Sequence, residues 1–415
     1  MSTGRVISRR RSQSRSLAPD ACVFAINGGS SSIKAAVFRV RQEPDRIASL
    51  LIERLGAAST RLVIRRFEAK GTSESARSIG AISPAEAASL LAKELRALSC
   101  DAPLLGIGHR LVFGGSDSPD HQIVTKPLLR KLDAASSLDS AHLPAELALI
   151  AAFQREFRGM AQVACLDTAF HRTMPRLATL LPIPKRFFDA GVRRYGYHGI
   201  SYEFLVRELA RVERFAAKRR RVVFAHLGSG ASMAAVLDGR SIDTTMAFSP
   251  LAGLMMGTRP GDLDPGAVIH IAEREHFDPR ALTEFLNKRC GLLGISGSSN
   301  DVRELLKRCD RDRRAGDAID LFCWSARRQL GAMIASLGGI DTLVFSGGIG
   351  EHSPEIRAGL CDGLSGIGIR LDAKANRSNK PLISDRRSAV CVRVIPTDEE
   401  VMIARHVARL VRERR

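Results

Sequence analysis

The 415-residue chain has few of the residues that mark several functional classes. Aromatic residues make up only 5% of it, too few for the stacking platforms that bind single-stranded nucleic acids. Its eight cysteines show no CxxC or CxxH spacing and no secretory signal accompanies them, which argues against zinc sites and disulfides. No apolar run approaches the ~20 residues that a membrane helix needs. We therefore expect a reduced, cytoplasmic protein without a membrane span.

Acidic residues are also scarce beside basic ones. The chain has 63 Lys and Arg against 44 Asp and Glu, a net charge of +19. Such an excess often accompanies nucleic-acid binding. Here, however, the basic residues are spread along the whole chain, and only five arginines fall in the first nineteen positions. We expect no nucleic-acid partner and interpret residues 1–21 as a disordered basic tail.

A polar, glycine-rich segment, NGGSSSIK at residues 27–34, is the most informative feature that is present. It lies between two short apolar runs, residues 22–26 and 35–38, and so predicts a β-hairpin with a polar tip. The GxxxxGK[ST] spacing of a Walker A loop is absent. Backbone N–H groups, three hydroxyls and one ammonium at the tip would suit phosphate. A simple hydrophilic turn is the alternative for this segment taken alone.

A second glycine-rich segment, SGGIGE at residues 346–351, follows the strand-like run 341–345. Behind it, Ser353-Pro354-Glu355 predicts the N-cap and first turn of a helix. A strand, a glycine turn and a helix start form the arrangement in which a helix dipole faces phosphate. Two such turns, far apart in the chain, favour two lobes that close on one nucleotide.

Strand-like and helical patterns alternate along the chain, which indicates an α/β architecture. Strands are expected over residues 106–113, 161–166, 221–226 and 234–237, the last followed by a hairpin turn at Asp238-Gly239. Helices are expected over residues 84–98 and 327–337. Arg110, Asp167, His226 and Asp398 lie at or near predicted strand ends, where open α/β sheets bind ligands.

Together these segments resemble the acetate kinase family of the actin/Hsp70/sugar-kinase superfamily. The resemblance is carried in family order by NGGSSSIK (27–34), GHRLVFGG (108–115), DTAFHRTMP (167–175), RRYGYHGIS (193–201), HLGSGAS (226–232), PLAGLMMGTRPGDLDPG (250–266), SGGIGE (346–351) and PTDEE (396–400). It implies a two-lobed, duplicated ribonuclease H-like ATPase fold with the active site between the lobes. Residues 22–167 and 397–415 would form the N-terminal lobe, and residues 168–396 the C-terminal, nucleotide-binding lobe.

The resemblance also implies reversible phosphoryl transfer from ATP to acetate, giving acetyl phosphate and ADP, by a homodimer. A carboxylate is already ionised at pH 7, so no general base is needed. Cations and fixed dipoles are needed instead, to hold an anion beside a polyanion and to neutralise the transferring group. Two alternatives stay open: a kinase that prefers propionate or another C3–C4 acid, and a non-acetate ATPase of the same superfamily.

The resemblance assigns roles residue by residue. Catalysis falls to Arg110, Asp167, His198 and Arg259. The acceptor would be held by Arg110, Val112, Ala141, His142 and Pro250. The nucleotide would contact Ser30, Ser32, Lys34, His226, Gly228, Ser229, Gly230, Asp301, Val302, Arg303, Gly347, Gly348, Ile349, Gly350 and Glu351. Mg²⁺, or Mn²⁺ in its place, would be held by Asn27 and Glu399.

Several of these residues could instead have a purely structural role. Arg110 alone would be read as a member of a surface ion pair, and His142 and His226 as structural histidines. Glu399 and Glu400 also suit the first turn of the last helix, where carboxylates are favoured.

Three positions depart from the usual family pattern. Ala141 stands where the family commonly has Leu, Ser229 where it has Asn, and Ala252 where it has Glu. Replacement of Leu by Ala would enlarge the acceptor pocket, and one methylene is worth only ~1–3 kcal/mol of discrimination. We therefore expect propionate or a similar acid to be accepted. Ser229 keeps a hydrogen-bonding group but shortens it.

Overall fold

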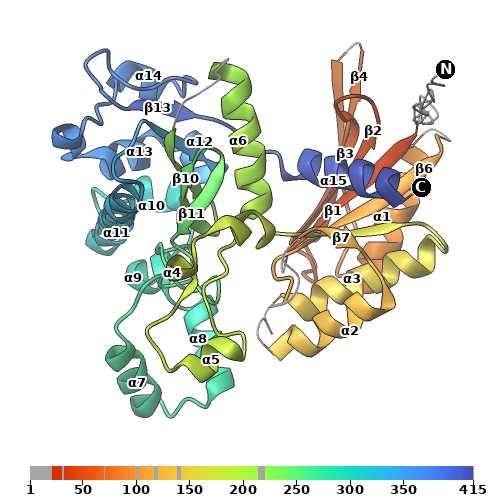
Figure 1. Ribbon diagram of the computed structural model, residues 1–415, viewed down its shortest axis with the longest axis horizontal. Helices are drawn as coiled ribbons and strands as arrows, with labels where there is room; N and C mark the ends of the chain where they lie inside the picture. Colours follow the sequence, from red (N-terminus) through yellow and green to blue (C-terminus); the bar gives the residue numbers. More distant parts are fainter. Residues whose placement is uncertain are drawn as a thin grey trace, which may run out of the picture.

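The computed structural model describes residues 21–29, 32–69, 71–99, 102–115, 120–137, 142–213 and 220–414. The expected basic tail, except Ala21, and two predicted site residues, Ser30 and Ala141, lie outside these residues. The chain folds around two β-sheets that stand side by side, each with its own helices (Figure 1).

The N-terminal sheet has the strand order β5-β4-β3-β2-β1-β6-β8-β7. Its strands are β1 (Cys22–Gly28), β2 (Ser32–Arg39), β3 (Asp45–Glu53), β4 (Arg61–Glu68), β5 (Gly71–Ser78), β6 (Leu104–Leu111), β7 (Gln122–Ile123) and β8 (Gln162–Leu166). β1 pairs antiparallel with β2, from Cys22 opposite Arg39 to Gly28 opposite Ile33. The predicted hairpin around residues 27–34 is therefore confirmed.

The C-terminal sheet has the order β11-β10-β9-β12-β13. Its strands are β9 (Arg221–Leu227), β10 (Ala231–Leu237), β11 (Arg240–Thr244), β12 (Thr342–Ser346) and β13 (Cys391–Val394). β9, β10 and β11 form an antiparallel meander, and β12 and β13 run parallel to β9. β1, β2, β3, β6 and β8 repeat this order and these directions in the N-terminal sheet. The expected duplicated, two-lobed α/β fold is confirmed.

Helices cover both faces of the N-terminal sheet. α1 (Pro84–Leu98) and α3 (Leu143–Glu156) pack on the face that carries Phe24 and Ile26. The last helix, α15 (Glu399–Arg414), packs on the opposite face against Val23 and Ala25. α2 (Lys126–Ala134) lies beside α3. The prediction for residues 84–98 is confirmed, and a capping box between Ser83 and Glu86 explains where α1 begins.

The C-terminal sheet is sandwiched in the same way. α6 (Gly199–Glu213) packs on one face through Tyr202, Leu205 and Leu209. α11 (Arg313–Leu337) and α13 (Pro354–Cys361) cover the other face, and the helix predicted over residues 327–337 is the second half of α11. The shorter helices are α4 (Arg176–Thr179), α5 (Lys185–Asp189), α7 (Pro265–Arg274), α8 (Pro279–Lys288), α9 (Gly291–Ser296), α10 (Val302–Leu306), α12 (Gly347–His352) and α14 (Ala373–Arg377).

Local predictions at the turns had mixed outcomes. Asp238 and Gly239 have φ of 51° and 77°, the conformation that a tight hairpin turn needs, so the turn between β10 and β11 is confirmed. The segment after β12 is not a turn, because residues 347–352 form α12 directly. The helix start predicted at Ser353-Pro354-Glu355 is confirmed, with Ser353 at the N-cap position of α13, although its side chain makes no capping hydrogen bond. Gly347, with φ of 75°, makes the sharp change of direction that starts a helix immediately after the strand.

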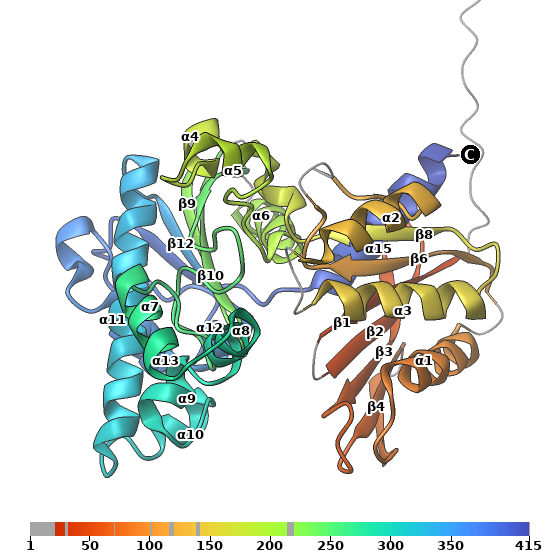
Figure 2. The same ribbon diagram turned by 90° about the horizontal axis from the view of Figure 1, so that it is seen from below.

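Figure 2 shows α6 at the side of the C-terminal sheet that faces the N-terminal half, and α6 contacts α15, which packs on the N-terminal sheet. The chain passes from the N-terminal sheet to the C-terminal one after β8, and returns between β13 and α15. Among the described residues, no helix combines the length and apolar character that a bilayer crossing requires.

Candidate active site

A cleft of about 970 Å³ receives residues from both sheets. Most of the predicted site residues line it: Asn27, Ser32, Lys34, Arg110, His198, His226, Gly228, Ser229, Gly230, Asp301, Val302, Arg303, Gly347, Gly348, Ile349, Glu351 and Glu399. The strand-end residues Arg110 and His226 thus meet at one place, as in other open α/β sheets. The volume is that of a small-molecule site.

Six predicted residues are not among those that line the cleft: Asp167, Val112, His142, Pro250, Arg259 and Gly350. Asp167 is fully buried, and Val112 packs in the same apolar cluster as Tyr197 and Met255. His142 occupies the N-cap position of α3 without capping it through its side chain.

A buried ion pair fixes Arg110. Arg110 Nε and Nη2 both donate to Asp167 Oδ2, at 3.0 and 2.6 Å, and Nη1 donates to Asn27 Oδ1 at 3.2 Å. Asn27 Nδ2 in turn donates to Glu399 Oε2 at 2.7 Å. The network joins β1, β6, the end of β8 and the start of α15, so four elements hold one guanidinium at the cleft wall.

Charge in this network is set by burial and by the neighbouring ions. Burial opposes the charge of Arg110, but the Asp167 and Glu399 carboxylates raise its pKa above the ordinary value, so it stays protonated. Burial raises the pKa of Asp167, against the lowering effect of Arg110. The pKa of Glu399 is lowered: burial opposes this, but Arg110, His226 and Lys34 together outweigh it. Glu399 is therefore an anion that faces the cleft.

His198 lies at a left-handed backbone position, with φ of 58°, immediately before α6. Its Nδ1 lies 2.8 Å from Ser232 Oγ, and the buried Tyr202 hydroxyl lies 2.5 Å from the same oxygen. If Tyr202 donates its single proton to Ser232, Ser232 can donate to Nδ1, and every proton in the chain has an acceptor. His198 Nε2 then carries the hydrogen. Burial, and then the nearby charges of His226, Arg110 and Arg259, hold the pKa of His198 well below its ordinary value.

Arg259 approaches the same place from the C-terminal side. Its Nη1 donates to the Pro250 carbonyl at 2.8 Å. A Cβ added at Gly230 would lie 2.9 Å from Arg259 Nη2 and 3.2 Å from His198 Nε2. Both side chains therefore pass over Gly230 so closely that a larger residue there would displace them.

Two short helices form the far end of the cleft. Asp301 caps α10, accepting a hydrogen bond from the Arg303 backbone at 2.8 Å. At the start of α12, the Gly347 N–H donates to Glu351 Oε1 at 2.9 Å. Beneath α12, the fully buried Arg357 donates to the carbonyls of Gly350 and Glu351. This cation supports the helix from behind.

The family was settled by comparison with known proteins. The model of the acetokinase family matches residues 22–405. The chain is 41% identical to the acetate kinase of Methylocella silvestris over 403 residues, covering 94% of this chain and 98% of that protein. It is 39% identical to the acetate kinase of Shouchella clausii, with 94% and 99% covered. The chain belongs to the acetokinase family. The expectation of a phosphotransferase with a carboxyl group as acceptor is confirmed.

Solved structures agree with this family assignment. The crystal structure of Porphyromonas gingivalis acetate kinase matches with a TM-score of 0.83 at 32% identity, covering 94% of this chain and 99% of that one. The propionate kinase of Francisella tularensis matches with a TM-score of 0.84, also at 32% identity, covering 93% and 98%.

Several residues at this acetokinase site were not predicted from the sequence. Gly257, Thr258, His352 and Thr397 also line the cleft. Behind it, both carboxylate oxygens of the buried Glu146 accept the Val112 N–H, at 3.2 and 3.1 Å. For Gly257 and Thr258, the signal was their place beside Arg259 in the motif of residues 250–266. We find no sequence signal for Glu146.

Proposed function

We propose that the chain transfers the γ-phosphoryl group of ATP to acetate at the point where Arg110, His198 and Arg259 converge. The observation that carries this proposal is the mutual proximity of the three donors. Arg110 comes from the N-terminal sheet, whereas His198 and Arg259 come from the C-terminal half. Both guanidiniums depress the pKa of His198, as nearby cations do.

The three donors suit different tasks. Arg110, locked by Asp167, presents its remaining N–H groups towards the cleft and would hold the acceptor carboxylate. Arg259 and His198 Nε2–H would donate to the transferring phosphoryl oxygens, where charge develops. Because the neutral imidazole adds a donor without a third full charge, it limits repulsion within the group. The carboxylate attacks without losing a proton, so no base is assigned.

A divalent metal fits the donor set at the cleft wall. Asn27 and Glu399 supply hard oxygen donors that face the cleft, the type that Mg²⁺ prefers. Asp167 Oδ1 is buried and makes no hydrogen bond within the described residues, so a further cation nearby would be favourable. We propose that Asn27 and Glu399 hold Mg²⁺, or Mn²⁺ in its place, directly or through water, and that Asp167 orients Arg110. When bound, the metal would neutralise charge on the ATP phosphates.

The nucleotide would lie along the glycine-rich elements. Ser32 and Lys34 from the first hairpin, Gly228 to Gly230 after β9, and the start of α12 surround the cleft with N–H groups and one ammonium. The helix dipole of α12 favours phosphate at its start. Asp301 and Arg303 at α10 would border the adenosine.

The acceptor's alkyl group would lie against Val112 and Pro250. Val112 comes two residues after Arg110, and the Pro250 carbonyl holds Arg259, so both apolar residues are tied to the proposed chemistry. Ala141 lies outside the described residues, but the resemblance assigns this position to the acceptor site, where alanine would leave more room than leucine. We propose that propionate is accepted alongside acetate.

We further propose that residues 22–167 with 397–415, and residues 168–396, move as two lobes. Their closure would exclude water and so limit hydrolysis of ATP.

We also propose a homodimer. α7 and α8 have no buried residue. Leu177 on α4 is 80% exposed and Ile269 on α7 is 60% exposed, and exposed apolar side chains of this kind are typical of protein–protein interfaces. No cysteine of the described residues forms a disulfide, in keeping with the cytoplasmic location that we propose.

The test is hydroxamate trapping of acyl phosphate with ATP, Mg²⁺ and a panel of C2–C4 acids. Product from acetate is expected, with propionate as a second substrate. Arg259→Leu should lower kcat by about 10²–10³-fold, because the lost donor acts on the transition state. Arg386→Leu, at an exposed position, is the matched control. Nucleotide binding without acyl phosphate from any acid would refute the proposed activity, and a near-normal rate for Arg259→Leu would remove Arg259 from the chemistry.

A further inference from the structure

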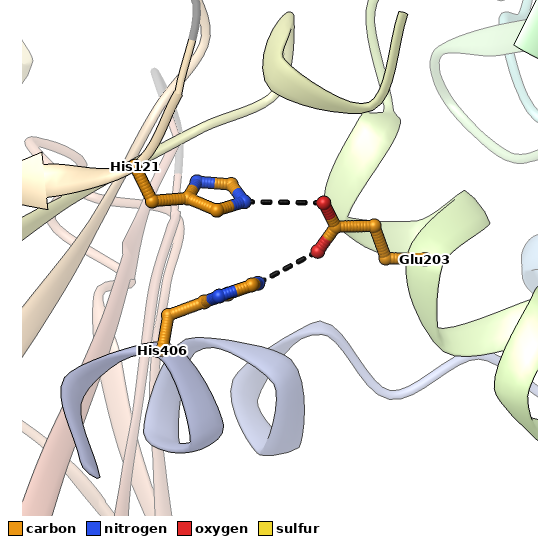
Figure 3. A group of neighbouring side chains, drawn as sticks. All are labelled: His121, Glu203 and His406. Carbon is orange, nitrogen blue, oxygen red and sulfur yellow. Dashed lines mark hydrogen bonds and ion pairs between the residues drawn. The ribbon is translucent and has the colours of Figure 1, made fainter. Parts of the chain in front are cut away.

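A second cluster of titratable side chains joins the two lobes (Figure 3), and none of its members lines the cleft. It consists of His121, just before β7, Glu203 on α6, and His406 on α15. Glu203 Oε1 lies 3.2 Å from His121 Nε2, and Glu203 Oε2 lies 2.6 Å from His406 Nε2. The two imidazole rings are tilted by 40° relative to each other, with centroids 3.8 Å apart. We call these three residues the latch.

The latch holds its own protons in a defined arrangement. The Leu166 N–H donates to His121 Nδ1 at 2.9 Å, so a neutral His121 must carry its hydrogen on Nε2 and donate it to Glu203. His406 Nε2 donates to the other carboxylate oxygen. Burial opposes ionisation, but the hydrogen bonds from His121 and His406 hold the pKa of Glu203 below its ordinary value. Glu203 is therefore an anion that receives one donor on each oxygen.

The same three groups are close enough to bind a transition metal, since their ligand atoms all lie within 4.8 Å of one another. The Leu166 contact argues against this. A metal-bound imidazole gives its Nε2 lone pair to the ion and donates a hydrogen from Nδ1. Here Nδ1 accepts a hydrogen bond, so a metal on Nε2 would set two N–H groups against each other.

Each member of the latch is joined to an element that carries a residue of the proposed site. His121 holds the N–H of Leu166, which directly precedes Asp167. His406 lies two turns along α15 from Glu399, and Glu203 lies in the first two turns of α6, which follows His198. The start of α6 touches the site as well. The Gly199 N–H donates to the Asp167 carbonyl at 2.9 Å, and a Cβ there would lie 2.0 Å from that oxygen.

We propose that Glu203 is a positioning residue: by receiving hydrogen bonds from His121 and His406, it locks α6 to β8 and α15. This lock keeps His198 in register with Asp167 and Glu399 across the two lobes. The inference rests on the proposed roles of those three residues. Its physical basis is that a shift of ~1 Å in a catalytic group costs about 10²-fold in rate.

Two substitutions at Glu203 distinguish the effect of its hydrogen bonds from the effect of its packing. Glu203→Ala removes both acceptors. Glu203→Gln keeps both bonds if its amide oxygen accepts from His121 and its amide nitrogen donates to His406, which must then be unprotonated at Nε2. In the wild type, a protonated His406 still donates to the carboxylate. The glutamine variant therefore loses one bond on acidification, and the wild type does not.

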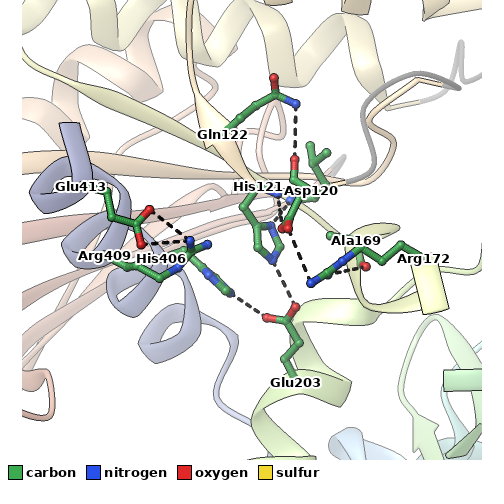
Figure 4. Close-up of polar contacts among 10 residues, drawn as sticks. Asp120, His121, Gln122, Ala169, Arg172, Glu203, His406, Arg409 and Glu413 are labelled. Carbon is green, nitrogen blue, oxygen red and sulfur yellow. Dashed lines mark hydrogen bonds and ion pairs between the residues drawn. The ribbon is translucent and has the colours of Figure 1, made fainter. Parts of the chain in front are cut away.

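The surroundings contribute other titratable and charged groups (Figure 4). Figure 4 draws Asp120 paired with Arg172, and Arg409 paired with Glu413 on α15. The other two groups are Cys165 on β8 and His171 after it. Burial, more than any of these charges, lowers the pKa of His406. All six are unchanged in both variants, so a difference between the variants and the wild type reports on Glu203.

The experiment measures kcat, and KM for ATP and acetate, from pH 5.5 to 8.5, with the folded fraction followed by circular dichroism. Glu203→Ala should lose about 10-fold or more in kcat with both KM values within about 3-fold. Glu203→Gln should stay within about 3-fold of the wild type at pH 8 and decline on acidification at a higher pH than the wild type. Glu208→Ala, on the same helix and at a carboxylate that accepts hydrogen bonds from Arg211, is the control.

Failure of the latch can be told from failure of the proposed function. If the wild type lacks acetate turnover, the proposed function fails, and hydrogen exchange of residues 199–205 still tests the latch. Faster exchange in Glu203→Ala than in Glu208→Ala supports the lock. Wild-type kcat and unchanged exchange in Glu203→Ala would overturn it. Stoichiometric binding of Zn²⁺ or Co²⁺ that Glu203→Ala abolishes would also overturn it, because the cluster would then be a metal site.

Discussion

Gly230→Ala offers the sharpest test of the proposed convergence of donors. Gly230 does not have a positive φ, so alanine can adopt its backbone conformation without strain. The new methyl group would lie 2.9 Å from Arg259 Nη2, about 0.5 Å short of ordinary contact at 3.4 Å. It would lie 3.2 Å from His198 Nε2. Because the first of these atoms ends a flexible side chain, Arg259 moves away at little cost to folding.

The cost falls on catalysis. Catalytic groups must be held within about 0.5 Å of the productive geometry, and ~1 Å of misplacement costs about 10²-fold. We therefore expect Gly230→Ala to lower kcat by about 10–10²-fold, or about 1.4–2.7 kcal/mol of transition-state stabilisation. The free energy of unfolding should change by less than about 1 kcal/mol. Hydroxamate trapping and urea denaturation measure the two quantities.

A matched control and a double variant complete the test. Gly331→Ala, in α11, adds a methyl group that meets nothing within 4 Å, and it should leave kcat unchanged. If Gly230→Ala acts by displacing Arg259, the double variant Gly230→Ala/Arg259→Leu should be little worse than Arg259→Leu alone. Independent, multiplying losses would show that alanine acts through another contact. A kcat within about 2-fold of the wild type would refute the reasoning.

Three further predictions concern the supports of the site. Asp167→Asn should lower kcat by about 10²-fold in the trapping assay, because it removes the charge that locks Arg110; wild-type turnover would contradict the role of the pair. Arg357→Met should reduce the free energy of unfolding in urea by about 2–4 kcal/mol, since it leaves buried carbonyls without a donor, and an unchanged value would show that water replaces it. Burial lowers the pKa values of His109 and His171 to about 4, below the unfolded value near ~6.5, so the unfolded chain binds more protons between these limits. Stability should therefore fall on acidification from pH 6.5 to 4 by about 1.4 kcal/mol per pH unit for each histidine, and His109→Gln should reduce that slope in urea titrations at a series of pH values.

Features that depend on neighbouring residues could be predicted from the sequence. The hairpin of β1 and β2 and the capped start of α1 follow from alternation, turn residues and a capping box, all within a few positions. The conformation after β12 could not be predicted in the same way. Glycines suit both a turn and a helix start, and only the packing of α12 over Arg357 decides between them.

Most features that depend on contacts between residues far apart in the sequence could not be predicted. The sequence patterns placed Arg110, Asp167 and Glu399 at the ends of strands and helices. The order of the motifs then assigned all three residues to one site. Nothing local indicates that Asp167 is fully buried behind Arg110. The latch is a stronger case, because His121, Glu203 and His406 belong to none of the motifs that carry the resemblance. They meet only where α6, α15 and the segment before β7 come into contact.

The burial of Asp167, which the sequence does not reveal, also explains how Arg110 is preorganised for the proposed reaction. A free arginine on a cleft wall loses side-chain entropy each time it binds an anion, at a cost of up to ~2 kcal/mol. Two N–H groups of Arg110 donate to one buried oxygen, Asp167 Oδ2. The plane and direction of the guanidinium are therefore fixed before any substrate binds. The Nη1 edge, which donates to Asn27, belongs to the same fixed guanidinium, which would hold the acceptor carboxylate in the proposed reaction. Preorganisation of this kind acts on the transition state and not only on binding, so loss of Asp167 should reduce kcat more than it raises KM for acetate.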